Sequence, residues 1–95
     1  MAAYLIYTQT EVLDSDLMAQ YRAGVGATVA KYGGENVVNN TFEVKEGAWD
    51  GARTVITRYP DMATLKAWYD SPEYKPLLDM RLKGARGNMI FVEGA

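Results

Sequence analysis

The sequence contains no cysteine and no histidine among its 95 residues. The absence of cysteine excludes disulfides, thiolate nucleophiles and zinc–thiolate sites, and it is typical of a cytoplasmic chain. The absence of histidine removes the side chain that most often serves as general base, metal ligand or haem ligand. Catalysis would therefore depend on tyrosine, arginine, lysine, asparagine, carboxylates or a bound cofactor. We predict no metal site and no cofactor.

The chain also lacks a long apolar run and a surface of one charge sign. Its 10 basic and 12 acidic residues are interspersed and give a net charge of −2, so no basic stripe is available to neutralise phosphates. No segment approaches the apolar length of a membrane-spanning helix. The opening "MAAYLIYTQTE" has no positive region of the kind that begins a signal peptide. We expect a cytoplasmic protein that binds neither nucleic acid nor membrane.

Hydrophobic residues are plentiful, at 48% of the chain, which predicts a folded core rather than disorder. The length is sufficient for one domain, residues 1–95, and too short for two. A domain of this size buries only about 60–65% of the surface that its unfolded chain exposes. Any additional apolar surface would therefore favour oligomerisation.

Hydrophobic periodicity and turn residues predict six elements. They are a strand at 3–9, a helix at 14–32 closed by Gly33 and Gly34, strands at 37–45 and 53–59, a helical region from Asp61 to Gly84 that restarts at Ser71, and a strand at 88–93. The order β-α-β-β-α-β is that of an α+β, ferredoxin-like fold. Right-handed crossovers would place the helices on one face of a four-stranded antiparallel sheet.

The first and last strands are apolar on both faces, as "YLIY" at 4–7 and "MIFV" at 89–92 show. Helices can cover only one face, and an antiparallel sheet with a solvated second face normally alternates apolar and polar residues. A second copy of the chain is the simplest cover, so we predict a homodimer through the sheet faces. We assign Met89 and Phe91 to the interface, where aspartate would give insoluble or unfolded protein.

The segment "AWYDSPEYKPLLDMR", residues 67–81, ends one helix and begins another. Ser71 and Pro72 are typical of the N-cap and first position of a helix. Ser71 is not expected to act as a nucleophile, because no histidine is present to accept its proton. On the helix that follows, five residues share one face: Tyr74, Leu77, Leu78, Arg81 and Leu82.

Arg81 is thus a charge within an apolar stripe. Its stem either carries the guanidinium out to water or leaves it inside, where it needs an acceptor. Glu43 or Glu93, from the same or the partner chain, would be a structural acceptor, and a ligand carboxylate or phenolate would be a functional one. We predict that Arg81 anchors an acidic or phenolic ligand beside Tyr69 and Tyr74, with Asn88 as a neighbour.

Aromatic residues are the second candidate feature of this region. They predict either core and dimer packing or a pocket between helices and sheet. Its candidate lining residues are Tyr21, Trp68, Tyr69 and Tyr74. Trp49 lies in the turn "EGAWDGA", where we expect it to contact the partner subunit.

Several motifs resemble the family called domain of unknown function 1330: "AYLIY", "KYGG", "EVKEGAW", "YPDM", "AWYDSPEYKPLLDMR" and the terminal "VEG". The resemblance spans nearly the whole chain and implies the dimeric α+β barrel, in which two ferredoxin-like sheets pack face to face. Two positions depart from the family pattern. Asn39 and Asn40 replace a glycine-rich turn, and Arg58 replaces a glutamate, which changes the charge of one candidate pocket wall.

Three functions remain open at this point. Dimeric α+β barrels include cofactor-independent monooxygenases and small isomerases whose sites use tyrosine, tryptophan, asparagine and arginine, so the resemblance implies an enzyme for a small acidic or phenolic compound. The alternatives are a small-molecule-binding protein without turnover and a structural dimer. Haem degradation is not expected, because the chain has no histidine ligand.

Overall fold

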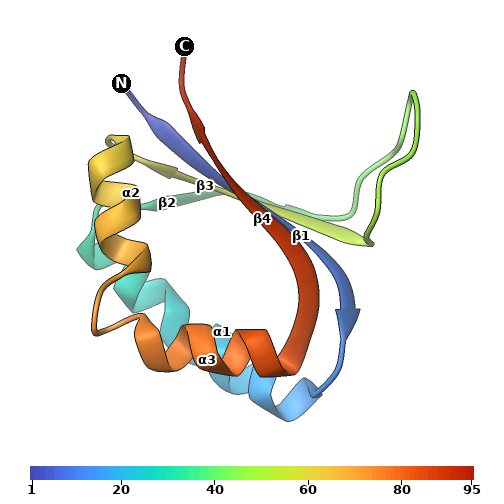
Figure 1. Cartoon of the computed structure of the whole chain (residues 1–95), viewed down its shortest axis with the longest axis horizontal. Coiled ribbons are helices and arrows are strands. Elements are labelled where there is room, and N and C mark those ends of the chain that lie inside the picture. The colour runs from blue at the N-terminus through green and yellow to red at the C-terminus, as the bar shows by residue number, and fades with distance from the viewer.

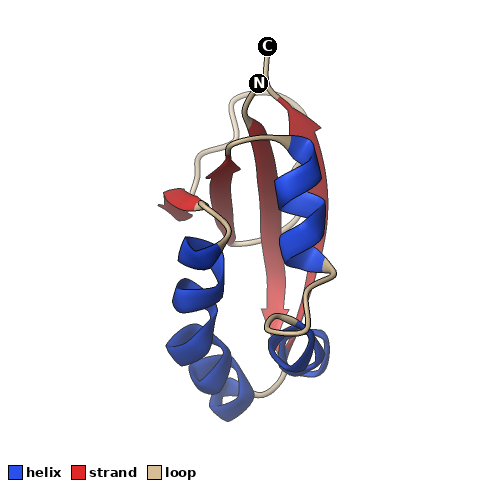
Figure 2. Ribbon diagram, turned by 90° about the vertical axis from the view of Figure 1, so that its left-hand side faces the viewer, coloured by secondary structure: helices blue, strands red, loops and turns tan.

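Four strands and three helices follow one another in the computed structural model of residues 1–95 (Figure 1). They are β1 (Ala3–Val12), α1 (Ser15–Lys31), β2 (Glu35–Asn40), β3 (Arg53–Tyr59), α2 (Met62–Tyr69), α3 (Lys75–Gly84) and β4 (Ala85–Glu93). The strands form one antiparallel sheet in the order β2-β3-β1-β4. All three helices lie on the same side of the sheet (Figure 2). This is the predicted α+β, ferredoxin-like fold.

The helix ends lie close to where the sequence predicts them, because local contacts determine them. The Asp14 side chain accepts hydrogen bonds from the backbone N–H groups of Asp16 at 3.0 Å and Leu17 at 3.1 Å and so caps α1. Gly33 follows α1 with a φ of +73°, a conformation that glycine adopts at little cost. Asp61 caps α2 by accepting a 2.7 Å bond from the Thr64 N–H.

The prediction of a strand at 37–45 is wrong for residues 41–45, which lie outside β2. Pairing between β2 and β3 stops at Asn40 and Thr54, and residues 41–52 form a loop that extends away from the helices (Figure 1). Gly51 explains where β3 begins. It has a φ of +105° and lies so close to β1 that a Cβ atom there would approach the Thr8 methyl group to 2.5 Å.

The helix predicted from Ser71 begins only at Lys75. Residues 71–74 form a turn in which the Ser71 hydroxyl accepts a bond from the Tyr74 N–H at 3.2 Å and donates one to the Trp68 carbonyl at 2.7 Å. Ser71 is therefore a capping residue of the turn rather than of the helix. The physical reason is Pro76, which has no N–H to donate back to residue 72. The last strand also differs, starting at Ala85 instead of residue 88.

The two faces of the sheet are distinguished by the register of β1. Leu5 and Tyr7 are buried under the helices, and Phe91 and Met89 of β4 lie directly beside them. Met89 and Phe91 therefore pack on the helical core, and their assignment to the dimer interface is wrong. The opposite, open face of the sheet carries their neighbours in β4, Ile90 and Val92, which are 54% and 40% exposed.

The core lies between the sheet and the pair α2 and α3, where Leu65, Trp68 and Tyr74 are almost completely buried. Leu82 is 61% exposed, so its predicted place on the buried face of α3 is wrong. In α1 only Met18 is fully buried. No helix has the length and apolar character needed to cross a membrane.

Candidate functional site

A cavity of about 540 Å³ lies between α1 and the helix-covered face of the sheet. Apolar side chains from both layers form its walls: Leu5, Val55 and Met89 from the sheet, and Met18, Val25 and Val29 from α1. The cavity exists because α1 packs sideways on α3 rather than down on the sheet. Its volume and apolar lining are typical of sites for small organic molecules.

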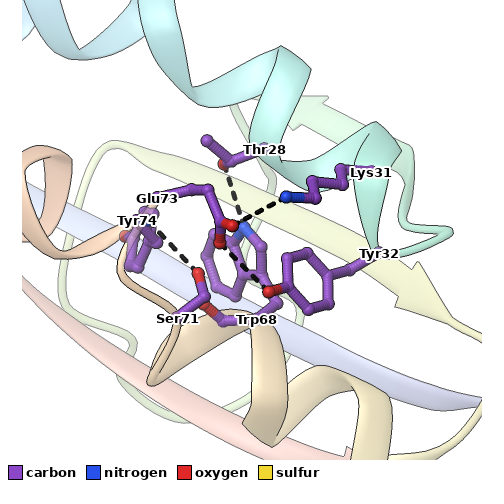
Figure 3. Close-up of polar contacts among 7 residues, drawn as sticks. All are labelled: Thr28, Lys31, Tyr32, Trp68, Ser71, Glu73 and Tyr74. Atoms are coloured by element: carbon purple, nitrogen blue, oxygen red, sulfur yellow. Dashed lines mark hydrogen bonds and ion pairs between the residues drawn. The ribbon is translucent and has the colours of Figure 1, made fainter.

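Polar contacts attach the C-terminal half of α1 to the corner between α2 and α3 (Figure 3). The Trp68 indole N–H donates to the Thr28 hydroxyl at 3.0 Å. Glu73 accepts bonds from the Lys31 ammonium at 2.7 Å and from the Tyr32 hydroxyl at 3.0 Å. These contacts hold the helical wall of the cavity in place, which is the structural role of the motif around Ser71.

We expect Glu73→Gln to remove an acid-sensitive part of the stability. The hydrogen bond from Lys31, supported by that from Tyr32, lowers the pKa of Glu73 from its ordinary 4.5 to about 2. A lowered pKa contributes stability that is complete above the ordinary value and is lost as the pH falls through the folded value. The melting temperature of the wild type should therefore fall more steeply between pH 4.5 and 2 than that of the variant.

Glu43→Gln is the matched control for this measurement. Glu43 pairs with Lys45 at 2.7 Å, but both side chains are more than three-quarters exposed, so the pair contributes little. Thermal melts at pH 7 should show a lower melting temperature for Glu73→Gln only. Identical pH profiles for Glu73→Gln and the wild type would show that this corner is not held by the Glu73 contacts.

One end of the cavity holds Arg81 and three tyrosines. The hydroxyl groups of Tyr21 and Tyr74 lie 2.9 Å apart, and the Arg81 Nε donates to the Tyr74 hydroxyl at 3.4 Å. The guanidinium carbon lies 4.9 Å from the centroid of the Tyr7 ring, in a cation–π contact. Burial, with Tyr74 as a second cause, raises the pKa of Tyr21, so Tyr21 is a neutral phenol at physiological pH.

Arg81 is only 6% exposed and has no carboxylate partner. None of the five ion pairs of the chain includes it, and neither Glu43 nor Glu93, its predicted structural acceptors, bonds to it. Its two Nη groups donate no hydrogen bond within the chain. The buried Tyr7 hydroxyl beside it is also without a partner. The Arg81 Nη groups are thus unused hydrogen-bond donors at this end of the cavity.

The lining of the cavity is positively charged although the chain as a whole is acidic. Three arginines, Arg22, Arg53 and Arg81, contribute to it, and no aspartate or glutamate does. Carboxylate or phenolate groups are the natural complement of such a lining, because arginine binds them through its planar fork.

Polar residues from β2 and β3 line the other end of the cavity, and the sequence analysis missed them. Arg53 donates through Nη1 to the Asn39 side-chain oxygen at 2.8 Å and to the Asn39 carbonyl at 3.2 Å. Asn36 lies nearby on the same strand and also lines the cavity. A signal was present, since asparagine is depleted in strands and β2 contains three in six residues.

The predicted site residues divide into those near the cavity and those remote from it. Tyr21, Trp68 and Arg81 line it, and Tyr74 lies directly behind them in hydrogen-bond contact with Tyr21 and Arg81. Tyr69 instead packs in the core, with its ring centroid 5.5 Å from that of Phe91 and 6.3 Å from that of Trp68.

Asn88 and Arg58 lie on the open face of the sheet, so their expected place at this cavity is wrong. Asn88 is opposite Thr8 in the register of β1 and β4. Arg58 pairs with Glu35 of the neighbouring strand at 2.7 Å. Both positions have the opposite strand parity to Leu5 and Tyr7, which is why they point away from the helices.

Solved structures of other proteins share this fold. A protein of unknown function from Rhodopseudomonas palustris has a TM-score of 0.76 at 18% identity, with 99% of this chain and 82% of that chain covered. A dimeric ferredoxin-like protein of unknown function from Jannaschia sp. CCS1 has a TM-score of 0.74 at 14% identity, with 99% of this chain and 100% of that chain covered. SnoaB, a cofactor-independent oxygenase from Streptomyces nogalater, has a TM-score of 0.65 at 12% identity, with 99% of this chain and 92% of that chain covered.

No curated protein sequence matches the chain. A family model does: the one described as domain of unknown function (DUF1330) matches residues 2–95, in agreement with the resemblance seen in the sequence motifs. The chain belongs to the DUF1330 family.

Proposed function

We propose that the chain forms a homodimer in which each subunit binds a small acidic or phenolic compound in the cavity under α1, with Arg81 as the anchor. The observation that carries this proposal is the buried guanidinium of Arg81 without a carboxylate partner. The tyrosines stabilise this buried charge only in part, because a neutral partner compensates a charge less than an anion does. A ligand anion would compensate the charge and accept from the unused Nη groups of Arg81.

The cavity supports a limited range of reactions. No carboxylate lines it, the chain has no histidine, and burial keeps Tyr21 protonated, so a general base of ordinary strength is missing at neutral pH. A reaction here would start from a substrate acidic enough to ionise against Arg81 itself. Cofactor-independent oxygenation or isomerisation of such a compound meets this condition, and SnoaB, which shares the fold, is described as a cofactor-independent oxygenase.

The missing general base equally favours a second candidate, a binding protein without turnover. In that case Arg81 holds the anion but no step follows. The two candidates share the same ligand class and differ only in the fate of the ligand.

The open face of the sheet supports the homodimer. Ile90, Val92 and Val38 are exposed on it, and the loop beyond β2 adds Phe42 and Trp49. The isolated chain exposes 5903 Å². A compact monomer of 10.5 kDa should expose about 5,400 Å². The exposed apolar residues of this face are what a second copy would cover, and the similar Jannaschia protein is described as dimeric.

A thermal-shift screen against simple phenols and aromatic acids tests the ligand class. Compounds that bind only the folded protein raise its melting temperature, and members of this class should do so more than aromatics of equal size without an acidic group. Oxygen uptake and product spectra, recorded without added flavin or metal, then distinguish the enzyme from the binding protein. If no anion raises the melting temperature, the proposed ligand site is wrong.

A further inference from the structure

The cavity floor contains a row of side chains that crosses three strands. Asn39 of β2 lies opposite Val55 of β3, which lies opposite Tyr7 of β1. Directly paired residues in an antiparallel sheet point to the same face, and all three line the cavity. The row is therefore polar at the β2 end, apolar in the middle and aromatic at the β1 end.

Each end of this row carries a guanidinium. Arg81 lies over the Tyr7 ring at 4.9 Å. Arg53 reaches back along the sheet to Asn39, where two hydrogen bonds hold it. Neighbouring strands are about 4.8 Å apart, so the two ends are separated by two strand spacings, roughly 10 Å. Val55 lies between them and offers an apolar surface for a ring.

We infer that the ligand is a two-headed compound, a planar ring with acidic groups at opposite ends, one bound at Arg81 and the other at Arg53 and Asn39. This inference rests on the proposed function, because it assumes that the cavity binds an anion at Arg81. It adds the second contact and restricts the ligand class to compounds such as aromatic hydroxy acids.

The environments of the two arginines determine the orientation of the ligand. Arg81 is buried and surrounded by tyrosine hydroxyls and rings, whereas Arg53 is exposed at the N-terminal end of β3. A carboxylate loses more hydration energy on burial than a phenol does, so it binds at the exposed end. The phenolic oxygen then lies at Arg81, whose positive charge favours its ionised form. Arg53 holds Asn39 through one nitrogen, and its other nitrogens donate no bond within the chain.

Binding of 4-hydroxybenzoate and of phenol, measured by isothermal titration, tests this inference. The wild type should bind 4-hydroxybenzoate at least tenfold more tightly than phenol, which corresponds to about 1.4 kcal/mol. Arg53→Met should remove this preference by weakening 4-hydroxybenzoate binding far more than phenol binding, because phenol contacts only the Arg81 end. Arg53 is exposed, so the variant keeps its fold.

Arg58→Met is the matched control. Arg58 lies on the same strand and also bonds to a residue of β2, Glu35, but it points to the opposite face of the sheet. The Arg58→Met variant should keep the tenfold preference for 4-hydroxybenzoate over phenol. If Arg53→Met keeps it too, or if the wild type binds the two probes equally, the two-headed ligand is wrong while the Arg81 anchor stands. If neither probe binds the wild type, the proposed function fails and this inference fails with it.

Discussion

Replacing Ile90 with aspartate is expected to disrupt the proposed homodimer and give insoluble or unfolded protein. Ile90 lies on the open face beside Ile6 and is 54% exposed in the single subunit. Full burial of such a side chain contributes about 1.5–3 kcal/mol, and roughly half of this remains for the interface. The two-fold symmetry of a homodimer applies the loss to both subunits, and the new carboxylates would be buried without partners. Size-exclusion chromatography with light scattering, together with thermal melts, measures the effect.

Leu82→Asp is the control for this substitution. Leu82 is also an exposed aliphatic residue, at 61%, but it lies on α3 in the helical layer. This variant should remain a dimer with a melting temperature close to that of the wild type. A soluble Ile90→Asp dimer that melts like Leu82→Asp would show that the open face is not the interface. A wild-type chain that is monomeric at micromolar concentration would exclude the homodimer altogether.

Arg81→Lys is expected to weaken ligand binding by tenfold or more, about 1.4 kcal/mol, while the dimer and most of the stability remain. Lysine keeps the positive charge but cannot present the planar fork that binds a carboxylate or phenolate. Arg81→Met should abolish binding. It should also leave the unliganded protein at least as stable, because it removes a buried charge that has no carboxylate partner.

Arg86→Met serves as the control, since Arg86 pairs with Glu11 at 3.3 Å, is largely exposed and does not line the cavity. It should bind the ligand like the wild type. Titration calorimetry with the best compound from the thermal-shift screen gives the dissociation constants. Normal binding by Arg81→Lys would disprove the anchor. Failure of both Arg81 variants to fold would assign Arg81 to the scaffold instead.

The sequence by itself determined the order of the elements and most of their ends. Caps such as Asp14, Gly33 and Asp61 act on residues within one turn, so their effects can be read without tertiary information. It also identified Arg81 as a charge within an apolar helix face and the first and last strands of the chain as apolar on both sides. Both observations depend only on the periodicity of a helix or a strand.

Only the tertiary structure decided which side of each strand faces the helices. Alternation divides β4 into two sets, but the pairing of Phe91 with Leu5 is what places Met89 and Phe91 in the core and Ile90 on the open face. The same parity moved Asn88 and Arg58 away from the cavity.

The sequence alone could not predict the cavity either. It depends on α1 packing against α3, and on a register that brings Asn39, Val55 and Tyr7 into one row across three strands. These residues are far apart in the chain, so no local pattern predicts their meeting. Strand pairing and helix packing, which are long-range interactions, determine where the charges of Arg53 and Arg81 lie.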